Sequence, residues 1–478
     1  MPRTIIRSQF HMKKLFPLIA AVAVAVLSTA CTHKEKDLAP EFLERGKANL
    51  EKGDLAAAIA DFTRAVKRDP RLAEAFLFRA YAFAENGKFD NAISDAKRSL
   101  KLDPQPAETY IEQGREFAEQ GNFARAIVRY TQAIRLDRRN ADALMARGNA
   151  FVERGDYDKA INDFNRVISL RPRDTEPLFA RANAHVKKKD FPNAIAVCGR
   201  ILRIDPDNAQ AYFILGTSYA ALGAWVNPIQ NFTRVIELDP SNAAAYFNRG
   251  NANARGNKFD LALADYTRAI ELDPQLAEAY FRRGHLLADK GDFDAAIADY
   301  AKATELDPQF ANAFYNRASE QLEKGDNERA IANFTQAIAL EQNTTSAFYG
   351  RARANARNGD HMTAIADFIR SLEFDSQNAS AYFERALSYA AINSYDDAIS
   401  DHTQALEFNP EYAMAYYHRG LVHAARGDHA AAIADFNRAI ALDPKHTASY
   451  RRLASSHAAM RAYFQFVLNH MKAILPWK

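Results

Sequence analysis

The stretch AIADFNRAIALDP, from Ala432 to Pro444, closely matches the stretch AIADFTRAVKRDP, from Ala58 to Pro70. The closing proline recurs between the two copies, always at a multiple of 34 residues, at Pro104, Pro172, Pro206, Pro240, Pro274, Pro308 and Pro410. A fixed period of this length is typical of small structural units stacked one on the next. The sequence therefore predicts twelve tandem units from Ala39 to His446, at residues 39–72, 73–106, 107–140, 141–174, 175–208, 209–242, 243–276, 277–310, 311–344, 345–378, 379–412 and 413–446.

Inside each unit, small and apolar residues follow the spacing of two short helices. In the unit that starts at Ala243, Tyr246 and Gly250 lie on one helical face, and Ala262 and Tyr266 lie on a second one. Position 8 of every unit is Gly or Ala, position 20 is almost always Ala, and position 24 is usually aromatic. We expect the small residues to let the two helices approach closely, with the aromatic ring filling the space beside them.

The turn between the two helices is also visible in the sequence. A glycine that can end one helix precedes an aspartate that can cap the next at Gly53-Asp54, Gly155-Asp156, Gly291-Asp292, Gly325-Asp326, Gly359-Asp360 and Gly427-Asp428. Some units depart from the pattern: Lys189 replaces the glycine, and Cys198 and His402 replace the aromatic residue at position 24. Pro228 replaces Ala at position 20, near a helix start, where proline is tolerated.

This pattern resembles the tetratricopeptide repeat (TPR), a helix-turn-helix unit of 34 residues with small, aromatic and proline positions in this order. The resemblance covers the chain from Ala39 to His446. It implies an all-α fold, a right-handed α-α superhelix of about twelve repeats, in which the first helices line a concave face. It also implies a protein that binds other proteins or peptides rather than an enzyme.

The first thirty residues are typical of a bacterial signal peptide. Met12 is followed by two lysines, an apolar run from Leu15 to Leu27 and three small residues before Cys31. The stretch LSTAC, ending at Cys31, resembles a lipobox, which implies lipidation of Cys31 and an outer-membrane address facing the periplasm. Residues 31–38 would then form a short tether. The alternative is ordinary cleavage and a secreted or periplasmic protein without lipid, and the true start is Met1 or Met12.

The last segment, residues 447–478, begins with a further helical pattern from Thr447 to Met460. The residues after it are unusually apolar, with Tyr463, Phe464, Phe466, Val467, Leu468, Ile474 and Trp477. One hypothesis is a capping helix packed on the last repeat. The other is a docking helix for a partner or a membrane surface.

Composition and motifs give no sign of catalysis. The formal net charge of the 478 residues is only +3, without the basic stripe that nucleic-acid binding would need. No phosphate loop, nucleophile elbow or paired-cysteine metal motif occurs, and no cofactor is implied. The recurring Asp and Glu residues are expected to cap helices or face solvent.

Histidine is the one unevenly distributed residue. Seven histidines lie near the C-terminal end: His402, His418, His423, His429, His446, His457 and His470. They leave open an alternative function as a metal-dependent or hydrolytic enzyme. We expect packed histidines instead, because no two are spaced as a helical ligand pair.

The resemblance places positions 2, 5, 6, 9, 12 and 13 of each unit on the concave face. Position 5 carries eight successive aromatic residues: Phe179, Phe213, Phe247, Phe281, Tyr315, Tyr349, Phe383 and Tyr417. Polar candidates at positions 6 and 9 are Asn248, Asn251, Arg282, His285, Asn316 and Arg353, and the early units carry many acidic residues at positions 2 and 13. The sequence thus predicts a lipid-anchored scaffold that binds a protein or peptide along this face, without nucleic acid. Such proteins resemble factors of envelope assembly, pilus biogenesis or cell-wall enzyme control.

Overall fold

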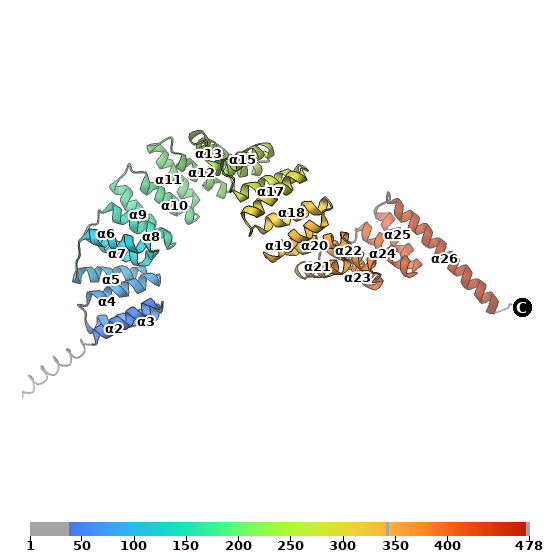
Figure 1. Cartoon of the computed structure of the whole chain (residues 1–478), viewed down its shortest axis with the longest axis horizontal. Helices are drawn as coiled ribbons and strands as arrows, with labels where there is room; N and C mark the ends of the chain where they lie inside the picture. Colours follow the sequence, from blue (N-terminus) through green and yellow to red (C-terminus); the bar gives the residue numbers. More distant parts are fainter. Residues whose placement is uncertain (1–37, 341–343, 475–478) are drawn as a thin grey trace, which may run out of the picture. The chain divides into compact units, whose positions relative to one another are not determined.

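The computed structural model describes residues 38–340 and 344–474, with side chains as far as residue 465. All regular structure within these residues is α-helical (Figure 1). The helices are α2 (Ala39–Glu51), α3 (Leu55–Arg68), α4 (Ala73–Glu85), α5 (Phe89–Leu102), α6 (Ala107–Glu119), α7 (Phe123–Leu136), α8 (Ala141–Glu153), α9 (Tyr157–Leu170), α10 (Glu176–Lys187), α11 (Phe191–Ile204), α12 (Ala209–Ala221), α13 (Val226–Leu238), α14 (Ala243–Arg255), α15 (Phe259–Leu272), α16 (Ala277–Asp289), α17 (Phe293–Leu306), α18 (Ala311–Glu323), α19 (Asn327–Ala339), α20 (Thr344–Arg357), α21 (His361–Phe374), α22 (Ala379–Ala391), α23 (Tyr395–Phe408), α24 (Ala413–Arg426), α25 (His429–Leu442) and α26 (Thr447–Ile474). The predicted fold class, an all-α superhelix of helix-turn-helix repeats, is confirmed. The predicted signal peptide and Cys31 lie outside the described residues.

The chain divides into two compact units, one ending at Pro240 and the other beginning at Ser241. The first holds repeats 1–6, with helices α2 to α13, and the second holds repeats 7–12, with helices α14 to α25, followed by α26. Within the second unit, successive first helices, from α16 to α24, contact one another more than successive second helices do. The first helices therefore line the inner face of that unit.

The turn inside each repeat has the same left-handed backbone in all twelve repeats. Nine of these residues are glycines, and the other three are Lys189, Asn257 and Asn393, with φ near 60°. A left-handed conformation costs a side-chain-bearing residue roughly 1 kcal/mol, so the fold imposes this turn even where glycine is missing. The following Asp caps the second helix in most of the predicted turns, as Asp54 does by accepting from the Ala57 N–H at 3.0 Å. Asp156 was predicted to cap as well, but its carboxylate pairs with the Lys159 ammonium at 3.1 Å.

The small residue at position 8 contacts the aromatic ring at position 24 of its own repeat. A methyl group added to Gly46 would lie only 2.5 Å from the Phe62 ring, so this glycine is required by close packing. Cys198 and His402 fill the same slot in their repeats, and both are fully buried.

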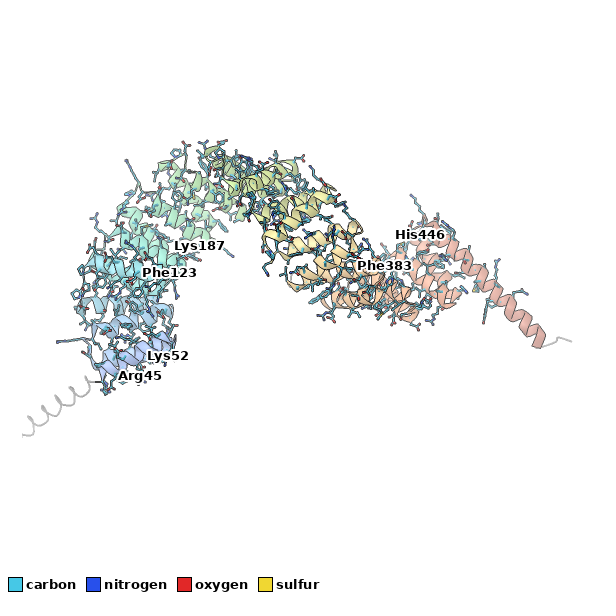
Figure 2. All side chains as sticks on the ribbon, in the orientation of Figure 1. Arg45, Lys52, Phe123, Lys187, Phe383 and His446 are labelled. Carbon is cyan, nitrogen blue, oxygen red and sulfur yellow. The ribbon has the colours of Figure 1, made fainter. Side chains whose placement is uncertain are left out.

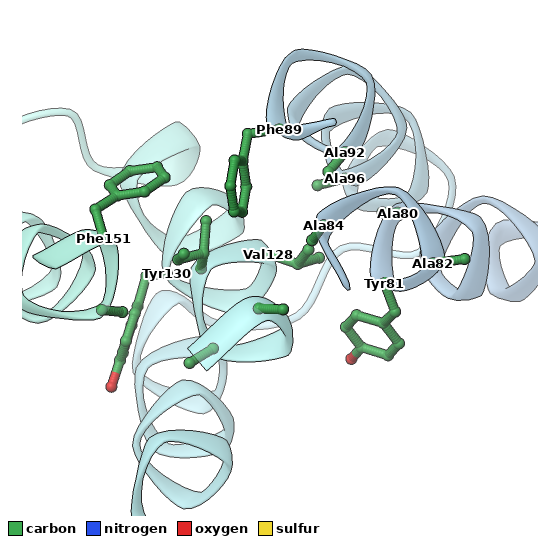
Figure 3. Close-up of a cluster of buried hydrophobic side chains, with 14 of the residues drawn as sticks. Ala80, Tyr81, Ala82, Ala84, Phe89, Ala92, Ala96, Val128, Tyr130 and Phe151 are labelled. Atoms are coloured by element: carbon green, nitrogen blue, oxygen red, sulfur yellow. The ribbon is translucent and has the colours of Figure 1, made fainter. Parts of the chain in front are cut away.

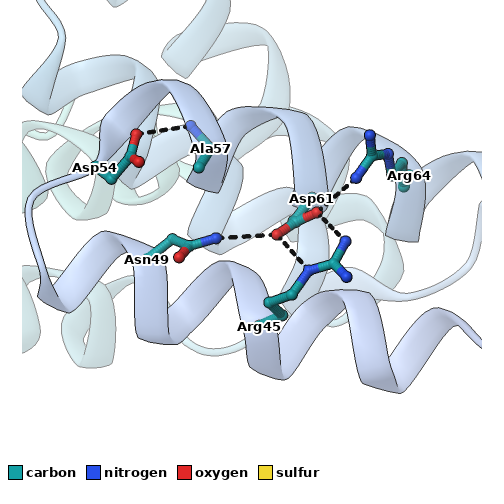
Figure 4. Close-up of polar contacts among 6 residues, drawn as sticks. All are labelled: Arg45, Asn49, Asp54, Ala57, Asp61 and Arg64. Carbon is teal, nitrogen blue, oxygen red and sulfur yellow. Dashed lines mark hydrogen bonds and ion pairs between the residues drawn. The ribbon is translucent and has the colours of Figure 1, made fainter.

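The aspartates at position 23 were expected to face solvent, and the structure corrects this expectation. Asp435, inside the stretch AIADFNRAIALDP, is only 6% exposed and accepts two hydrogen bonds from Arg419 at 2.9 and 2.8 Å. The first repeat shows the same network, in which Asp61 also accepts from Asn49 at 3.0 Å (Figure 4). The Arg-Asp pair between positions 7 and 23 recurs as Arg45-Asp61, Arg79-Asp95, Arg147-Asp163, Arg249-Asp265, Arg283-Asp299, Arg351-Asp367, Arg385-Asp401 and Arg419-Asp435.

The same arginine often reaches the repeat before its own. Its Nη1 donates to a threonine hydroxyl at position 25 of the preceding repeat, at 3.0 to 3.2 Å, in the pairs Arg79-Thr63, Arg147-Thr131, Arg283-Thr267, Arg351-Thr335 and Arg419-Thr403. Arg181 donates to Asn165 at 2.7 Å in the equivalent place. One side chain thus joins the two helices of a repeat and also joins neighbouring repeats.

Candidate partner-binding face

The predicted aromatic residues at position 5 lie between the two helices of their own repeats. Their ring centroids are 5.5 to 6.0 Å from the ring at position 24 in the pairs Phe213-Phe232, Phe247-Tyr266, Phe281-Tyr300, Tyr315-Phe334, Tyr349-Phe368, Phe383-His402 and Tyr417-Phe436. Phe179 packs in the same way against an apolar cluster that contains Leu178 and Cys198. Phe281 is buried at 9% exposure and Phe383, which Figure 2 labels, at 8%, whereas the other six are partly exposed. These rings are part of the helix packing and offer a ligand only part of their surface.

The polar candidates on α16 extend further into solvent. The guanidinium of Arg282 pairs with Glu278 at 2.8 Å and lies 5.7 Å from the centre of the Phe281 ring, while its side chain is 51% exposed. His285, one turn later, lies 3.3 Å from Asp289 and is 56% exposed. Exposed pairs of this kind contribute little to stability, so both side chains are free to exchange their partners for a ligand.

Three asparagines of the second unit are tied to the helix surface. Asn248 donates to the Ala244 carbonyl at 2.8 Å, and Asn251 accepts from the Tyr266 hydroxyl at 2.9 Å. Burial raises the pKa of Tyr300, whose hydroxyl contacts Asn316. The tyrosines at position 24 thereby fix the orientation of two of these asparagines.

A small cavity lies between α20 and α22. It has a volume of about 230 Å³ and is lined by Arg353, Ala356, Arg357, His361, Glu384, Leu387 and Ser388. Arg353 lies 3.5 Å from Glu323 and 5.9 Å from the centre of the Tyr349 ring. Burial raises the pKa of Glu384, although the charges of Arg353 and Arg357 act in the opposite direction. The cavity therefore combines two cations with a carboxyl group that is only weakly stabilised as an anion.

The acidic character of the first unit is reduced by ion pairs within the chain. Lys47 pairs with Glu74 at 2.6 Å, and Lys187 pairs with Glu153 at 3.2 Å. Arg171 pairs with Asp142 at 3.0 Å. A basic partner would have to compete with these lysines and arginines for the same carboxylates.

The third repeat departs from regular stacking. Elsewhere in the first unit the first helix of a repeat packs on the second helix of the repeat before it. In repeat 3 the second helix, α7, packs against both α4 and α5, while α6 packs mainly on α7. Figure 3 shows Val128 and Tyr130 of α7 beside residues of α4, α5 and α8. The α6-α7 hairpin has thus been reoriented against repeat 2.

Four residues explain the reorientation. Positions 3 and 10 of a first helix are usually buried small residues, such as Ala143 and Ala150, but α6 has Thr109 and Glu116 there. Positions 18 and 22 of a second helix are usually exposed, yet in α7 they are Ala124 and Val128, which are 3% and 1% exposed. The apolar surface therefore lies on α7, and α7 is the helix that docks.

This hairpin covers position 9 of repeat 2. Tyr81 is 2% exposed, with its ring 5.7 Å from that of Phe117 and the guanidinium groups of Arg125 and Arg129 each 5.6 Å from its centre. Burial raises the pKa of Tyr81 to about 12. Glu85 of the same helix pairs with Arg125 at 2.8 Å. This part of the inner face is filled by the chain itself, which the regular period in the sequence did not reveal.

The described histidines near the C-terminal end lie in different surroundings. His402 is fully buried without a hydrogen-bond partner for either ring nitrogen, and its ring lies 6.2 Å from that of His418. His446 contacts Ser449, and His457 is exposed. Among the residues that the structure describes, no three His, Cys, Asp or Glu side chains are grouped so that they could hold a metal ion. The side chain of His470 lies outside the described part.

The chain was also compared with known proteins. A family model described as tetratricopeptide repeat matches residues 43–106, 111–177, 315–380 and 383–447, and related models match 151–215, 243–276, 265–298 and 284–322. No curated protein matches the chain.

Several solved structures are similar to parts of the chain. YrrB, described as a TPR protein with an unusual peptide-binding site, is 25% identical over 39% of this chain and 96% of its own, with a TM-score of 0.36. MamA is 28% identical over 34% of this chain and 96% of its own, with a TM-score of 0.33. The APC/C hetero-tetramer Cut9-Hcn1 is 16% identical over 86% of this chain and 95% of that one, with a TM-score of 0.37. Because the family model matches more than half of the sequence, the chain belongs to the tetratricopeptide repeat family, whose arrays are non-enzymatic scaffolds for protein-protein interaction.

Proposed function

We propose that the inner face of repeats 7–12 binds an extended or helical segment of a partner protein. The observation that carries the proposal is the exposure of Arg282 and His285 on α16, beside partly buried aromatic rings and above a continuous stack of first helices. Such a surface offers a peptide a charge, a ring edge and amide groups, and the repeats do not have to unfold for the peptide to reach them. The reoriented third repeat supports the choice of the second unit, because it covers part of the inner face of the first.

The proposal also includes a place for the scaffold. The resemblance of LSTAC to a lipobox supports attachment of a lipid at Cys31 and a position on the outer membrane facing the periplasm. There the chain would hold a partner near the envelope, in its assembly, in pilus biogenesis or in control of cell-wall enzymes. Labelling cells with palmitate tests the attachment: the wild type should carry label and Cys31→Ser should not. An unlabelled wild type would instead support the secreted, unlipidated module.

Site-specific photo-crosslinking tests the binding face. A crosslinking residue at position 285 should capture a defined partner in cells, whereas one at Ala298, exposed on the second helix α17, should not. The neighbouring candidate Phe281 is buried, so a crosslinking residue at position 281 would not reach a partner as well as one at position 285. The same partner should then bind the purified chain, and Arg282→Ala combined with His285→Ala should weaken that binding roughly tenfold. Equal capture from both positions, or unchanged binding by the double variant, would refute the proposed face.

A further inference from the structure

Helix α26 begins like the first helix of a thirteenth repeat. It packs on α25, and Ser449 and Ser456, at positions 3 and 10 of such a repeat, are 0% and 3% exposed. Small residues at these two positions are buried in most repeats, as Ala245 and Ala252 are in repeat 7. The first half of α26 therefore packs on α25 in the manner of the first helix of a further repeat.

The second half of α26 extends beyond the repeat array. Every earlier first helix ends near position 14, but α26 continues through this point for 28 residues in total, twice the length of α25. At 1.5 Å per residue this is about 42 Å of helix beside about 21 Å of α25. Figure 1 shows α26 running past the end of α25. Tyr463 and Phe464, on the overhanging half, are each 64% exposed, with ring centroids 6.4 Å apart.

The sequence of this segment has a one-sided charge. No Asp or Glu occurs from Thr447 to Lys478, although acidic residues are frequent in the rest of the chain. The cations are Arg451, Arg452, Arg461, Lys472 and Lys478. Apolar residues recur with helical spacing at Met460, Phe464, Val467, Met471 and Ile474, and the same spacing places Arg461 and Lys472 together on one flank of this stripe.

We propose that the overhanging half of α26, residues 461–474, lies in the interface of a bilayer that contains anionic lipids. A helix with an aromatic and aliphatic stripe, cations along its flank and no acidic residue has the composition of helices that lie in this plane. Cationic side chains are attracted to the negative surface potential, while the apolar stripe enters the acyl boundary. A second copy of the chain is a poorer occupant, since two such helices would bring only like charges together. Among the described residues no helix is long and apolar enough to span a membrane, so the proposed contact is interfacial.

Fluorescence of Trp477 tests this contact directly. The sequence has two tryptophans, so Trp225→Phe leaves Trp477 as the sole reporter, close to the end of α26. A local signal is needed because a lipid at Cys31 would by itself bring the chain to vesicles. With vesicles of phosphatidylethanolamine and phosphatidylglycerol, we expect a blue shift and quenching by brominated acyl chains. Vesicles of phosphatidylcholine alone should give a markedly smaller change.

Two variants in this background separate the contributions. Tyr463→Ser with Phe464→Ser should weaken the lipid-dependent signal roughly tenfold or more, because the apolar insertion is lost. Arg461→Glu should weaken it roughly tenfold on anionic vesicles only. Phe408→Ser, at a 41% exposed ring on α23, is the matched control and should change neither signal.

Three results would overturn the proposal. One is a Trp477 spectrum that ignores both kinds of vesicle. Another is a double variant that keeps the full signal. The third is a chain that dimerises through residues 461–474 without responding to lipid. None of these outcomes depends on partner capture at position 285, so the inner-face proposal stands or fails separately.

Discussion

At the residue scale, the Arg at position 7 pairs with the Asp at position 23 in eight of the twelve repeats, which places an ion pair inside an otherwise apolar contact. Asp163 is 3% exposed and its partner Arg147 is 12% exposed in their side chains. Both residues are visible in the sequence as a periodic pair, but periodic carboxylates suit helix surfaces equally well. Only the approach of the two helices shows that these carboxylates are buried.

Removing one partner of such a pair should be costly. Asp163→Ala leaves the mostly buried Arg147 guanidinium without its anion, so we expect a loss of about 3 kcal/mol in local stability. Asp142→Ala is the matched control, because the pair Arg171-Asp142 is exposed at 47% and 76% and should cost less than about 1 kcal/mol. Hydrogen exchange of the α8 and α9 amides measures both. Equal losses of stability in the two variants would show that the buried pair contributes no more than the exposed one.

The burial of His402 should make the folding stability of its repeat depend on pH. Burial lowers the pKa of His402 to about 3, with smaller effects of His418 and Arg419, and burial lowers the pKa of His418 to about 4. The unfolded chain titrates near 6.5, so below that pH it binds protons that the folded repeat does not. The stabilisation by neutral His402 is complete above about pH 6.5 and is lost as the pH falls from there towards about 3.

The variant His402→Phe tests this dependence, since Phe occupies the same slot in other repeats. Between pH 7 and pH 4.5 its local unfolding free energy should fall by about 2 kcal/mol less than that of the wild type. The exposed His285→Gln is the control and should follow the wild type at every pH. Hydrogen exchange of α22 and α23 amides across this range gives the measurement, and parallel curves for His402→Phe and the wild type would contradict the assignment.

At the scale of elements, the sequence predicts helices well and their docking less well. The positions of Gly, Ala and aromatic residues correctly indicate a helical hairpin in repeat 3, because Gly114 packs against Tyr130 as in other repeats. The docking of that hairpin depends on which outer face is apolar. Thr109, Glu116, Ala124 and Val128 carried that signal, but it becomes clear only when each position is compared across all twelve repeats.

Placing a charge on this docking face should separate repeat 3 from repeat 2. Val128→Asp buries a carboxylate without a partner, and we expect a loss of about 3 kcal/mol or more. Ala298→Asp, at the same position 22 in repeat 8, is exposed and should cost about 0.5 kcal/mol. Denaturation followed by hydrogen exchange of α4, α5 and α7 compares the two. If Val128→Asp is as mild as its control, α7 does not dock as described.

At the scale of the whole molecule, each unit has its own continuous set of packed repeats. The sequence could predict the number and kind of repeats, since these follow from period and residue size. It could not predict the division into two units, because the 34-residue period runs through Pro240 without change. The place of Arg282 and His285 on the first helix of repeat 8 follows from the period, whereas the burial of Phe281 and Phe383 was not predictable, because burial depends on how closely two helices pack.

The division predicts that the second unit folds alone. A fragment from Ser241 to Lys478 should keep the helix content per residue of the full chain by circular dichroism, because repeat arrays are stabilised by neighbouring contacts. It should also bind the partner captured from position 285 with an affinity within about threefold of that of the full chain. A fragment that is unfolded, or that has lost binding, would show that repeats 1–6 contribute to the second unit.

The arginine that reaches back to the preceding repeat also has a mechanical consequence. Neighbouring repeats are joined by a hydrogen bond at pairs such as Arg283-Thr267 and Arg351-Thr335. In repeat 6, Leu215 stands in place of this arginine and cannot donate such a bond. Under a pulling force the array would extend unevenly, and the interfaces between repeats that lack this bond would separate first. The resistance of each interface between repeats to stretching would depend on two residues, an arginine at position 7 and a hydrogen-bond acceptor at position 25 of the repeat before it.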